Sequence, residues 1–184
     1  MNINMPHSTH RKIITETKNW ITNVVIGCNF CPFAAKEMKK GSIHFEVSEA
    51  SDRKTVLEKV LAMMIQLDTH EEIETSLLIL PDGFQSFDAY LDLMKTTEKR
   101  LVKNKYEGIY QVAGFHPLYL FTGTDHEDAS NYTNRSPYPM LHFLREKSVS
   151  HAVDNYPDIE NVPNRNIAYA NSKGLVYMQQ LMGK

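Results

Sequence analysis

Cys31 is the residue of this sequence best suited to nucleophilic chemistry, because of the residues around it. It stands in the segment Gly27-Cys28-Asn29-Phe30-Cys31-Pro32-Phe33-Ala34. Proline is favoured at the first position of a helix, which predicts a helix from Pro32 to about Lys40 with Cys31 at its N-cap. Free amides and the positive end of the helix dipole would stabilise a thiolate there. The alternative is that Cys31 packs as a small hydrophobic residue between aromatic neighbours.

Cys28 and Cys31 also form a Cys-X-X-Cys pair, which is typical of redox disulfides when it follows a strand. Here the pair follows a predicted helix, so dithiol chemistry is the less favoured interpretation.

A structural zinc site needs four ligands, and the sequence has neither a second Cys-X-X-Cys nor a His-X3-His pair. We therefore predict no metal site. The residues that could join a catalytic metal, although no spacing singles them out, are His116, Asp125, His126 and His142.

His116 is the best candidate for a general acid or base. It directly follows a predicted strand, and so it would lie at a carboxyl end, where open α/β sheets bind their ligands. The alternative is an imidazole that only hydrogen-bonds the loop backbone ahead of Pro117.

Arg135 is the best candidate for binding an anion. It stands before a helix that Ser136-Pro137 would open, where its guanidinium and the helix amides could hold a carboxylate or phosphate. On that helix His142 and Arg145 would share one face. Alternatively, Arg145 only pairs with a surface carboxylate, and the asparagines only shape the loop. The predicted substrate-binding residues are Asn131, Asn134, Arg135, His142 and Arg145.

The elements that would position these residues alternate between helices and strands. Apolar residues recur at helical spacing in some segments and at every second position in others. Glycine and proline mark the ends. In chain order we predict a helix over 13–25, a helix over 32–40, a strand over 43–47, a helix capped by Ser51, a strand over 76–80, a helix capped by Ser86 and a strand over 109–115.

Strands joined by helices of this length favour right-handed parallel crossovers. We therefore predict an α/β fold, with α+β as the alternative. The sheet would be small and mostly parallel, with three or four strands, packed helices and room for an antiparallel edge strand. Within one domain over 1–184 we expect a loose N-terminus (1–10), a helix pair plus strand-helix core (11–115), a functional loop (116–135) and a helical C-terminal part (136–184), with helix starts at Pro163 and Leu175.

The composition predicts a soluble domain. The chain has 184 residues, 42% of them apolar, and a net charge of −2, which gives no reason to expect nucleic acid or an anionic membrane as partner. The apolar runs are too short for a membrane span, and the N-terminus lacks the features of a secretory signal, so we expect a cytoplasmic protein. We interpret the basic residues between Lys99 and Lys105, interleaved with glutamates, as a solvated helix face.

Three stretches, 26–34, 111–119 and 131–145, resemble a family of bacterial proteins of about this length, named domain of unknown function family 1415. The family motifs are Gly-Leu-Asn-Leu-Cys-Pro-Phe-Ala, then Gln-Val-Ala-Ser-Phe-His-Pro, then Asn-X-Thr-Asn-Arg-Ser-Pro-Tyr-Pro-X-Leu-His-Leu-Leu-Arg-Glu. This sequence departs from them at Cys28, in place of leucine, and at Gly114, in place of serine. The first departure weakens the dithiol interpretation. The resemblance implies a shared site but no reaction, at residues that here are Cys31, His116, Arg135, His142 and Arg145.

Together these residues predict a small cytoplasmic enzyme that acts on an anionic metabolite. It would be a Cys/His-dependent transferase or hydrolase with Cys31 as nucleophile or redox thiol and His116 as acid/base. The alternative is a non-catalytic, anion- or metabolite-binding regulatory module with a structural cysteine. A third hypothesis is an interaction protein that uses the loop over 116–134. The sequence leaves the cofactor, the substrate and the oligomeric state open.

Overall fold

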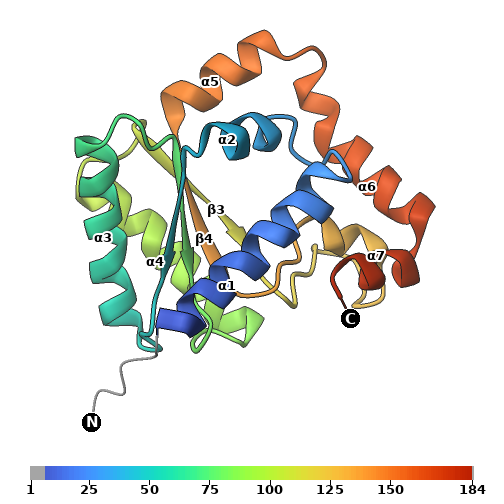
Figure 1. Cartoon of the computed structure of the whole chain (residues 1–184), viewed down its shortest axis with the longest axis horizontal. Helices are drawn as coiled ribbons and strands as arrows, with labels where there is room; N and C mark the ends of the chain where they lie inside the picture. Colours follow the sequence, from blue (N-terminus) through green and yellow to red (C-terminus); the bar gives the residue numbers. More distant parts are fainter. Residues whose placement is uncertain (1–6, 184) are drawn as a thin grey trace.

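The computed structural model describes residues 7–183, and within them a four-stranded sheet lies between two layers of helices (Figure 1). Helices α3 (Arg53–Thr69) and α4 (Phe87–Lys103) cover one face. The other face is covered by α1 (His7–Trp20), by its π-helical continuation η1 (Ile21–Ile26) and by C-terminal helices. Each face of the sheet therefore has its own hydrophobic core.

The strands run β1 (Ile43–Val47), β2 (Thr75–Ile79), β3 (Tyr110–Phe115) and β4 (Met140–Arg145), and their order in the sheet is β1-β2-β4-β3. Strands β1 and β2 are parallel, whereas β4 is antiparallel to both of its neighbours. It follows that β1, β2 and β3 point in one direction, as crossover connections require. The α/β class is confirmed. The pairing differs from the mostly parallel sheet that we expected, because β4 enters between β2 and β3.

Strand β4 corrects the prediction of a helix opened by Ser136-Pro137. Met140 contributes to the core on the α1 side, whereas Leu141 and Phe143 contribute to the core on the α3–α4 side. A central strand that is buried on both faces shows no alternation of apolar and polar residues, and leucines three apart then imitate a helix. The helical C-terminal part consequently begins at Glu146, not at position 136.

The helices of the α3–α4 layer begin at side-chain caps. Ser86 caps α4 by accepting the amide of Ala89, as predicted. For α3 the cap is Asp52 and not Ser51, because the Asp52 carboxylate accepts the Thr55 amide at 3.0 Å. Both residue types are favoured at this position, so the sequence could not separate the two neighbours.

The segment that leads to Cys31 differs locally from the prediction. Residues 7–10, expected to be loose, begin α1, and residues 1–6 lie outside the described part. Helix α2 (Ala34–Lys40) has Phe33 at its N-cap, so Cys31 precedes the helix without capping it. Gly27 ends the π-helix so tightly that a Cβ there would overlap the Asn23 carbonyl oxygen.

The C-terminal helices support this segment. They are α5 (Glu146–Asn155), α6 (Val162–Lys173) and α7 (Leu175–Leu181), and the predicted starts near Pro163 and Leu175 are confirmed. From α6, Asn166 donates to the Phe30 carbonyl at 2.7 Å.

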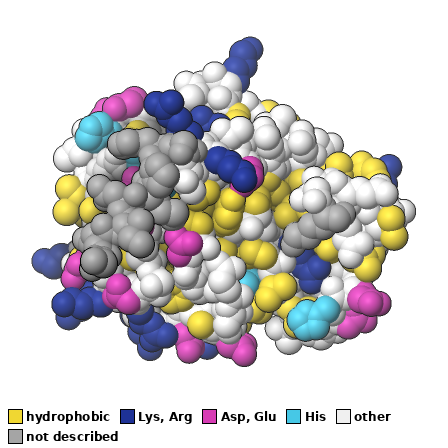
Figure 2. All heavy atoms as spheres, turned by 60° about the horizontal axis from the view of Figure 1, so that its bottom comes forward, with side chains coloured by type: hydrophobic (Ala, Val, Ile, Leu, Met, Phe, Trp, Pro, Cys, Tyr) yellow, Lys and Arg dark blue, Asp and Glu magenta, His cyan; other side chains and the backbone are white. Residues whose placement is uncertain are grey.

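Within 7–183 no helix combines the length and the apolarity that a membrane crossing requires. Figure 2 shows one face of the molecule, with a band of hydrophobic side chains between charged ones.

Candidate functional site

His116 lies at the carboxyl end of β3, as predicted, but both of its ring nitrogens are bound to backbone. Nδ1 accepts the Leu118 amide at 3.0 Å, so Nε2 carries the proton and donates to the Phe84 carbonyl at 2.9 Å. The ring is fully buried and packs against Phe87 and Tyr90. Burial lowers its pKa, although the bond to Phe84 opposes this shift. His116 would have to break a backbone contact to exchange a proton with a substrate.

Asn131 organises the long loop after β3 from within. It lies fully buried in the short 3-10 helix η2 (Ala129–Thr133). Its side-chain oxygen accepts the Phe121 amide and the Thr124 hydroxyl, and its nitrogen donates to the Asp125 carbonyl. The oxygen has both of its lone pairs engaged and the nitrogen donates once, so the amide is a structural centre of the loop.

The Arg135 guanidinium is bound inside the same loop. It donates to the carbonyls of Tyr119 at 3.2 Å and His126 at 3.0 Å, and it lies over the Tyr132 ring. The side of the loop is closed by Trp20, whose indole donates to the Arg135 carbonyl at 3.0 Å. Only 7% of Arg135 is exposed. Its charge is therefore directed at carbonyl oxygens rather than at a free anion position.

Arg145 lies on the opposite face of β4 from His142, because alternate residues of a strand point to opposite sides. Its guanidinium donates to the carbonyls of Leu67, His70 and Ile73 at 2.6–3.1 Å. These carbonyls belong to the end of α3 and the turn after it. An arginine at this position satisfies helix carbonyls that lack intrahelical partners and complements the helix dipole.

The two cysteines have different surroundings, and both are free thiols. Cys28 is buried, and burial raises its pKa despite the Tyr169 hydroxyl and the Lys173 charge, which act in the opposite direction. Cys31 is only partly buried, in the non-helical connection between η1 and α2. Cys31 is thus the more accessible thiol, as nucleophilic chemistry requires.

His142 is held by Thr75 at the start of β2. The distance from its Nε2 to Thr75 Oγ1 is 2.6 Å, and the same hydroxyl donates to the Phe143 carbonyl at 2.6 Å. A hydroxyl has one proton, so it must accept from Nε2–H, which leaves Nδ1 as the unprotonated nitrogen. Nδ1 has no hydrogen bond to any residue over 7–183. Desolvation lowers the pKa of His142 to about 4, so the ring is neutral at physiological pH.

The surface around His142 is incompletely covered. Side chains of β3 and β4 on the α1 side of the sheet are partly exposed, and the His142 and Phe115 rings lie 5.9 Å apart. Cys31 packs against the core on this same side. We call this surface the β3–β4 patch. It consists of Gln111, Ala113, Phe115, His142 and Leu144.

A cleft of about 360 Å³ opens at the free edge of β3, between that strand and α4. Tyr90 and Met94 form its apolar floor, and Asn134 joins its lining. Its charged residues are Lys95 and Glu98, which are one helical turn apart and opposite in sign. The cleft therefore offers no net charge for an anionic ligand.

The predicted site residues do not form one constellation. Asn134 lines the cleft, His142 belongs to the β3–β4 patch on the α1 side, and Arg145 donates to the end of α3 on the opposite side. Across the described range, no three His, Cys, Asp or Glu side chains gather as metal ligands do. Among the described residues, the groups best suited to a reaction are the unbonded Nδ1 of His142 in the β3–β4 patch and the partly exposed thiol of Cys31 on the same side of the sheet.

Residues 12–180 match the model of a family described as "Protein of unknown function (DUF1415)". The chain belongs to this family. No curated protein and no solved structure matches the chain. In this DUF1415 protein the three motifs lie at the junction of η1 and α2, along β3, and from η2 through β4. The second and third motifs lie on the neighbouring strands β3 and β4 and in the loop after β3, whereas the first contacts α6, so part of what the motifs encode is the fold itself.

Thr75 is the functional candidate that the sequence analysis missed. It opens a fully buried strand and lies 67 positions before His142 in the chain. A threonine at the start of a strand is ordinary, because β-branched residues favour strands. Only the register of β2 with β4 shows that its hydroxyl orients the imidazole.

Proposed function

We propose that this protein is a Cys/His-dependent transferase or hydrolase that acts on a small molecule bound at the β3–β4 patch. The observation that carries the proposal is the hydrogen bond between His142 and Thr75, which leaves Nδ1 as a free proton acceptor. A neutral imidazole whose tautomer is set by its other nitrogen presents a free lone pair at any pH above about 4, and the low pKa makes it a weaker base than one tuned near pH 7. The partly exposed Cys31, on the same side of the sheet, supplies the nucleophile.

The proposed chemistry is acyl transfer. His142 Nδ1 takes the thiol proton as Cys31 sulfur bonds to a carbonyl carbon, and the leaving group departs with that proton. Water or a second acceptor then attacks the thioester, and the thiol is restored. The patch presents mainly apolar side chains with the single amide of Gln111, which favours a substrate with an apolar part. We do not place an anion here, because Arg135 and Arg145 are bound to carbonyls.

The first test is alkylation of the native protein with iodoacetamide, mapped by mass spectrometry. We expect Cys31 to react in the folded protein and the buried Cys28 to react only after unfolding. Cys31→Ser should abolish the native reaction, and Cys28→Ser should not change it. His142→Gln and Thr75→Val should slow it about tenfold or more if the imidazole assists the thiol.

The second test is turnover of a panel of nitrophenyl esters and thioesters by the native protein and by Cys31→Ser. Turnover that Cys31→Ser removes supports the proposal. Protection of Cys31 until unfolding, or turnover that survives Cys31→Ser, would overturn it. The molecule would then be the non-catalytic alternative, a binding module with a structural cysteine.

A further inference from the structure

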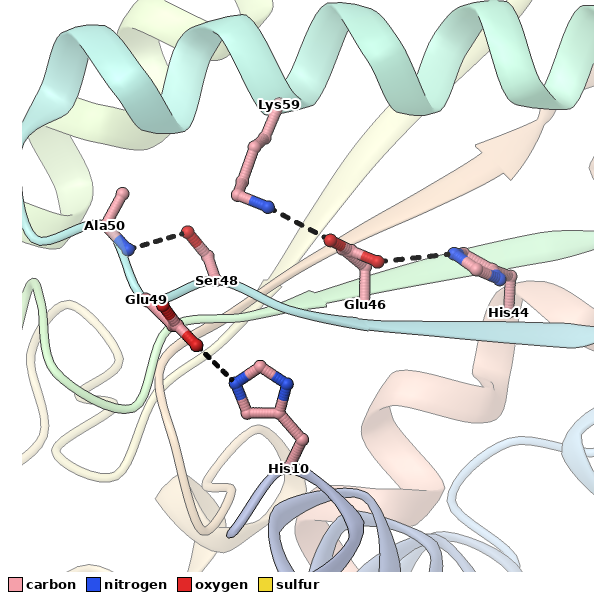
Figure 3. A network of polar contacts seen from close by, with 7 residues as sticks. All are labelled: His10, His44, Glu46, Ser48, Glu49, Ala50 and Lys59. Carbon is pink, nitrogen blue, oxygen red and sulfur yellow. Dashed lines mark hydrogen bonds and ion pairs between the residues drawn. The ribbon is translucent and has the colours of Figure 1, made fainter. Parts of the chain in front are cut away.

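The two edges of the sheet differ in how they are protected. On the edge strand β1, Glu46 pairs with Lys59 of α3 at 3.0 Å, and His44 lies beside it; just beyond, Glu49 lies 3.1 Å from His10 of α1 (Figure 3). Charged side chains on an edge strand discourage pairing with another sheet. The other edge strand, β3, has the sequence Tyr-Gln-Val-Ala-Gly-Phe, with neither a charge nor a proline.

Hydrophobic side chains are exposed beside this unprotected edge. On the outer face of α4, Leu91 is 38% exposed and Val102 is 54% exposed. Ile109 and Leu118, at the two ends of β3, are about half exposed (49% and 50%). These four are half of the eight large hydrophobic side chains exposed over 7–183, and they lie on α4 or in the segments that flank β3. The other four are Ile65, Val153, Val176 and Tyr177.

Helix α4 carries a stripe that is complementary to itself. Leu91, Lys95, Glu98 and Val102 are all exposed, and spacings of four, three and four place them along one side of the helix. Read in reverse, the stripe again has an apolar residue at each end and two opposite charges between. If two such helices pack antiparallel, Leu91 of each copy lies opposite Val102 of the other, and Lys95 lies opposite Glu98.

A second stripe beside the first follows the same rule. Asp88 and Asp92 lie in the first half of α4, and Lys99 and Lys103 lie in the second half, all of them exposed. Within one helix, like charges four residues apart repel each other. None of these four residues forms an ion pair with any described residue. An antiparallel second copy would set each aspartate against a lysine.

We propose that two copies of this chain form a twofold dimer in which α4 packs antiparallel against α4 of the second copy. The twofold axis passes between Lys95 and Glu98, perpendicular to the layer of helices, so each stripe meets its own equivalent. The same axis sets the two β3 edges antiparallel beside the helices. The cleft between α4 and β3 then lies in the interface and receives apolar side chains of the second copy. Charge complementarity and exposed apolar area on one surface favour a second copy over any other occupant.

Charge reversal gives a specific test by sedimentation velocity over a concentration series up to about 100 µM. The native chain is expected to form a dimer. Lys95→Glu alone and Glu98→Lys alone each replace two attractions by two repulsions, and each should weaken the dimer about tenfold or more. The chain with both reversals should dimerise like the native chain. An equimolar mixture of the two single variants should form a heterodimer, because all their facing charges are then opposite.

The apolar ends of the stripe are tested with a matched pair of variants. Leu91→Asp should abolish the dimer, whereas Ile65→Asp, at an exposed position of α3 outside the surface, should leave it intact. Circular dichroism checks that all variants are folded. A native chain that stays monomeric throughout the series would overturn the proposal. So would a dimer that tolerates both single reversals, since association would then use another surface.

Discussion

Gly114 of β3 lies directly beneath the phenol of Tyr90 on α4, so that a Cβ at position 114 would overlap the Tyr90 hydroxyl oxygen. That hydroxyl donates to the Met140 carbonyl at 2.7 Å, and only 1% of Tyr90 is exposed. The hydroxyl cannot move aside without losing this bond. The departure from the family motif at Gly114 therefore has a structural explanation in this chain.

Gly114→Ala is predicted to lower the free energy of unfolding by about 2 kcal/mol, because the added methyl displaces Tyr90. Tyr90→Phe alone should cost about 1–2 kcal/mol through the lost hydrogen bond. In the double variant, the loss of unfolding free energy should be about 1 kcal/mol smaller than the sum of the two single losses, because the oxygen that obstructs the methyl is gone. Urea denaturation measures all three.

The control for this double-mutant comparison is Tyr106→Phe, which removes a hydroxyl that donates to Asp68 elsewhere in the molecule. Combined with Gly114→Ala, its cost should be additive. If the losses from Gly114→Ala and Tyr90→Phe were also additive, the methyl would have to be accommodated without displacing the Tyr90 hydroxyl.

The stability of the fold should fall as the pH drops from about 6.5 toward 4. The pKa of His142 is lowered to about 4 and that of His116 is lowered as well, both by burial, whereas an unfolded histidine titrates near 6.5. Between these values the unfolded chain binds more protons, so the free energy of unfolding rises with pH. The lowered pKa of His142 contributes about 3 kcal/mol to the free energy of unfolding, and this contribution is fully present above pH 6.5.

Denaturation curves at several pH values between 4 and 7.5 measure this dependence. His142→Gln serves as the comparison, because it removes one titrating group and leaves the carboxylates that contribute to every acid unfolding curve. The variant should show a shallower slope. An unchanged slope would mean that His142 titrates alike in the folded and unfolded chain.

The tautomer of His142 can be observed directly by long-range proton–nitrogen correlation in nuclear magnetic resonance. We expect the proton on Nε2, because the Thr75 hydroxyl already donates to Phe143. The titration midpoint should be about 4. Thr75→Val should let the ring sample both tautomers. A proton on Nδ1 in the native protein would remove the base from the proposed mechanism.

Arg145→Met is predicted to lower the free energy of unfolding by about 2–4 kcal/mol, because it leaves the carbonyls of Leu67, His70 and Ile73 without their donor. Amide hydrogen exchange should accelerate at the end of α3. The neighbouring exposed Lys147→Met is the control and should have little effect. If Arg145 instead held a substrate, Arg145→Met would reduce turnover and leave stability unchanged.

The sequence predicted most elements well, because helices and half-buried strands leave clear periodic patterns. The main error concerned β4, where burial on both faces removes the alternation that marks a strand, and it placed His142 and Arg145 on one face. The polar motif residues were harder to interpret. The partners of Arg135 and His116 are backbone carbonyls and an amide, and no residue type in a sequence reveals those.

The hydrogen bond from the Trp20 indole to the Arg135 carbonyl joins residues 115 positions apart in the chain. Trp20 ends α1, so this contact requires α1 to be docked on the sheet, and pairings between residues so far apart in sequence form slowly in folding. The loop after β3 should therefore be among the last parts of the molecule to fold. During synthesis its aromatic side chains would stay exposed until β4 leaves the ribosome, and apolar surface exposed in this way favours aggregation of a nascent chain.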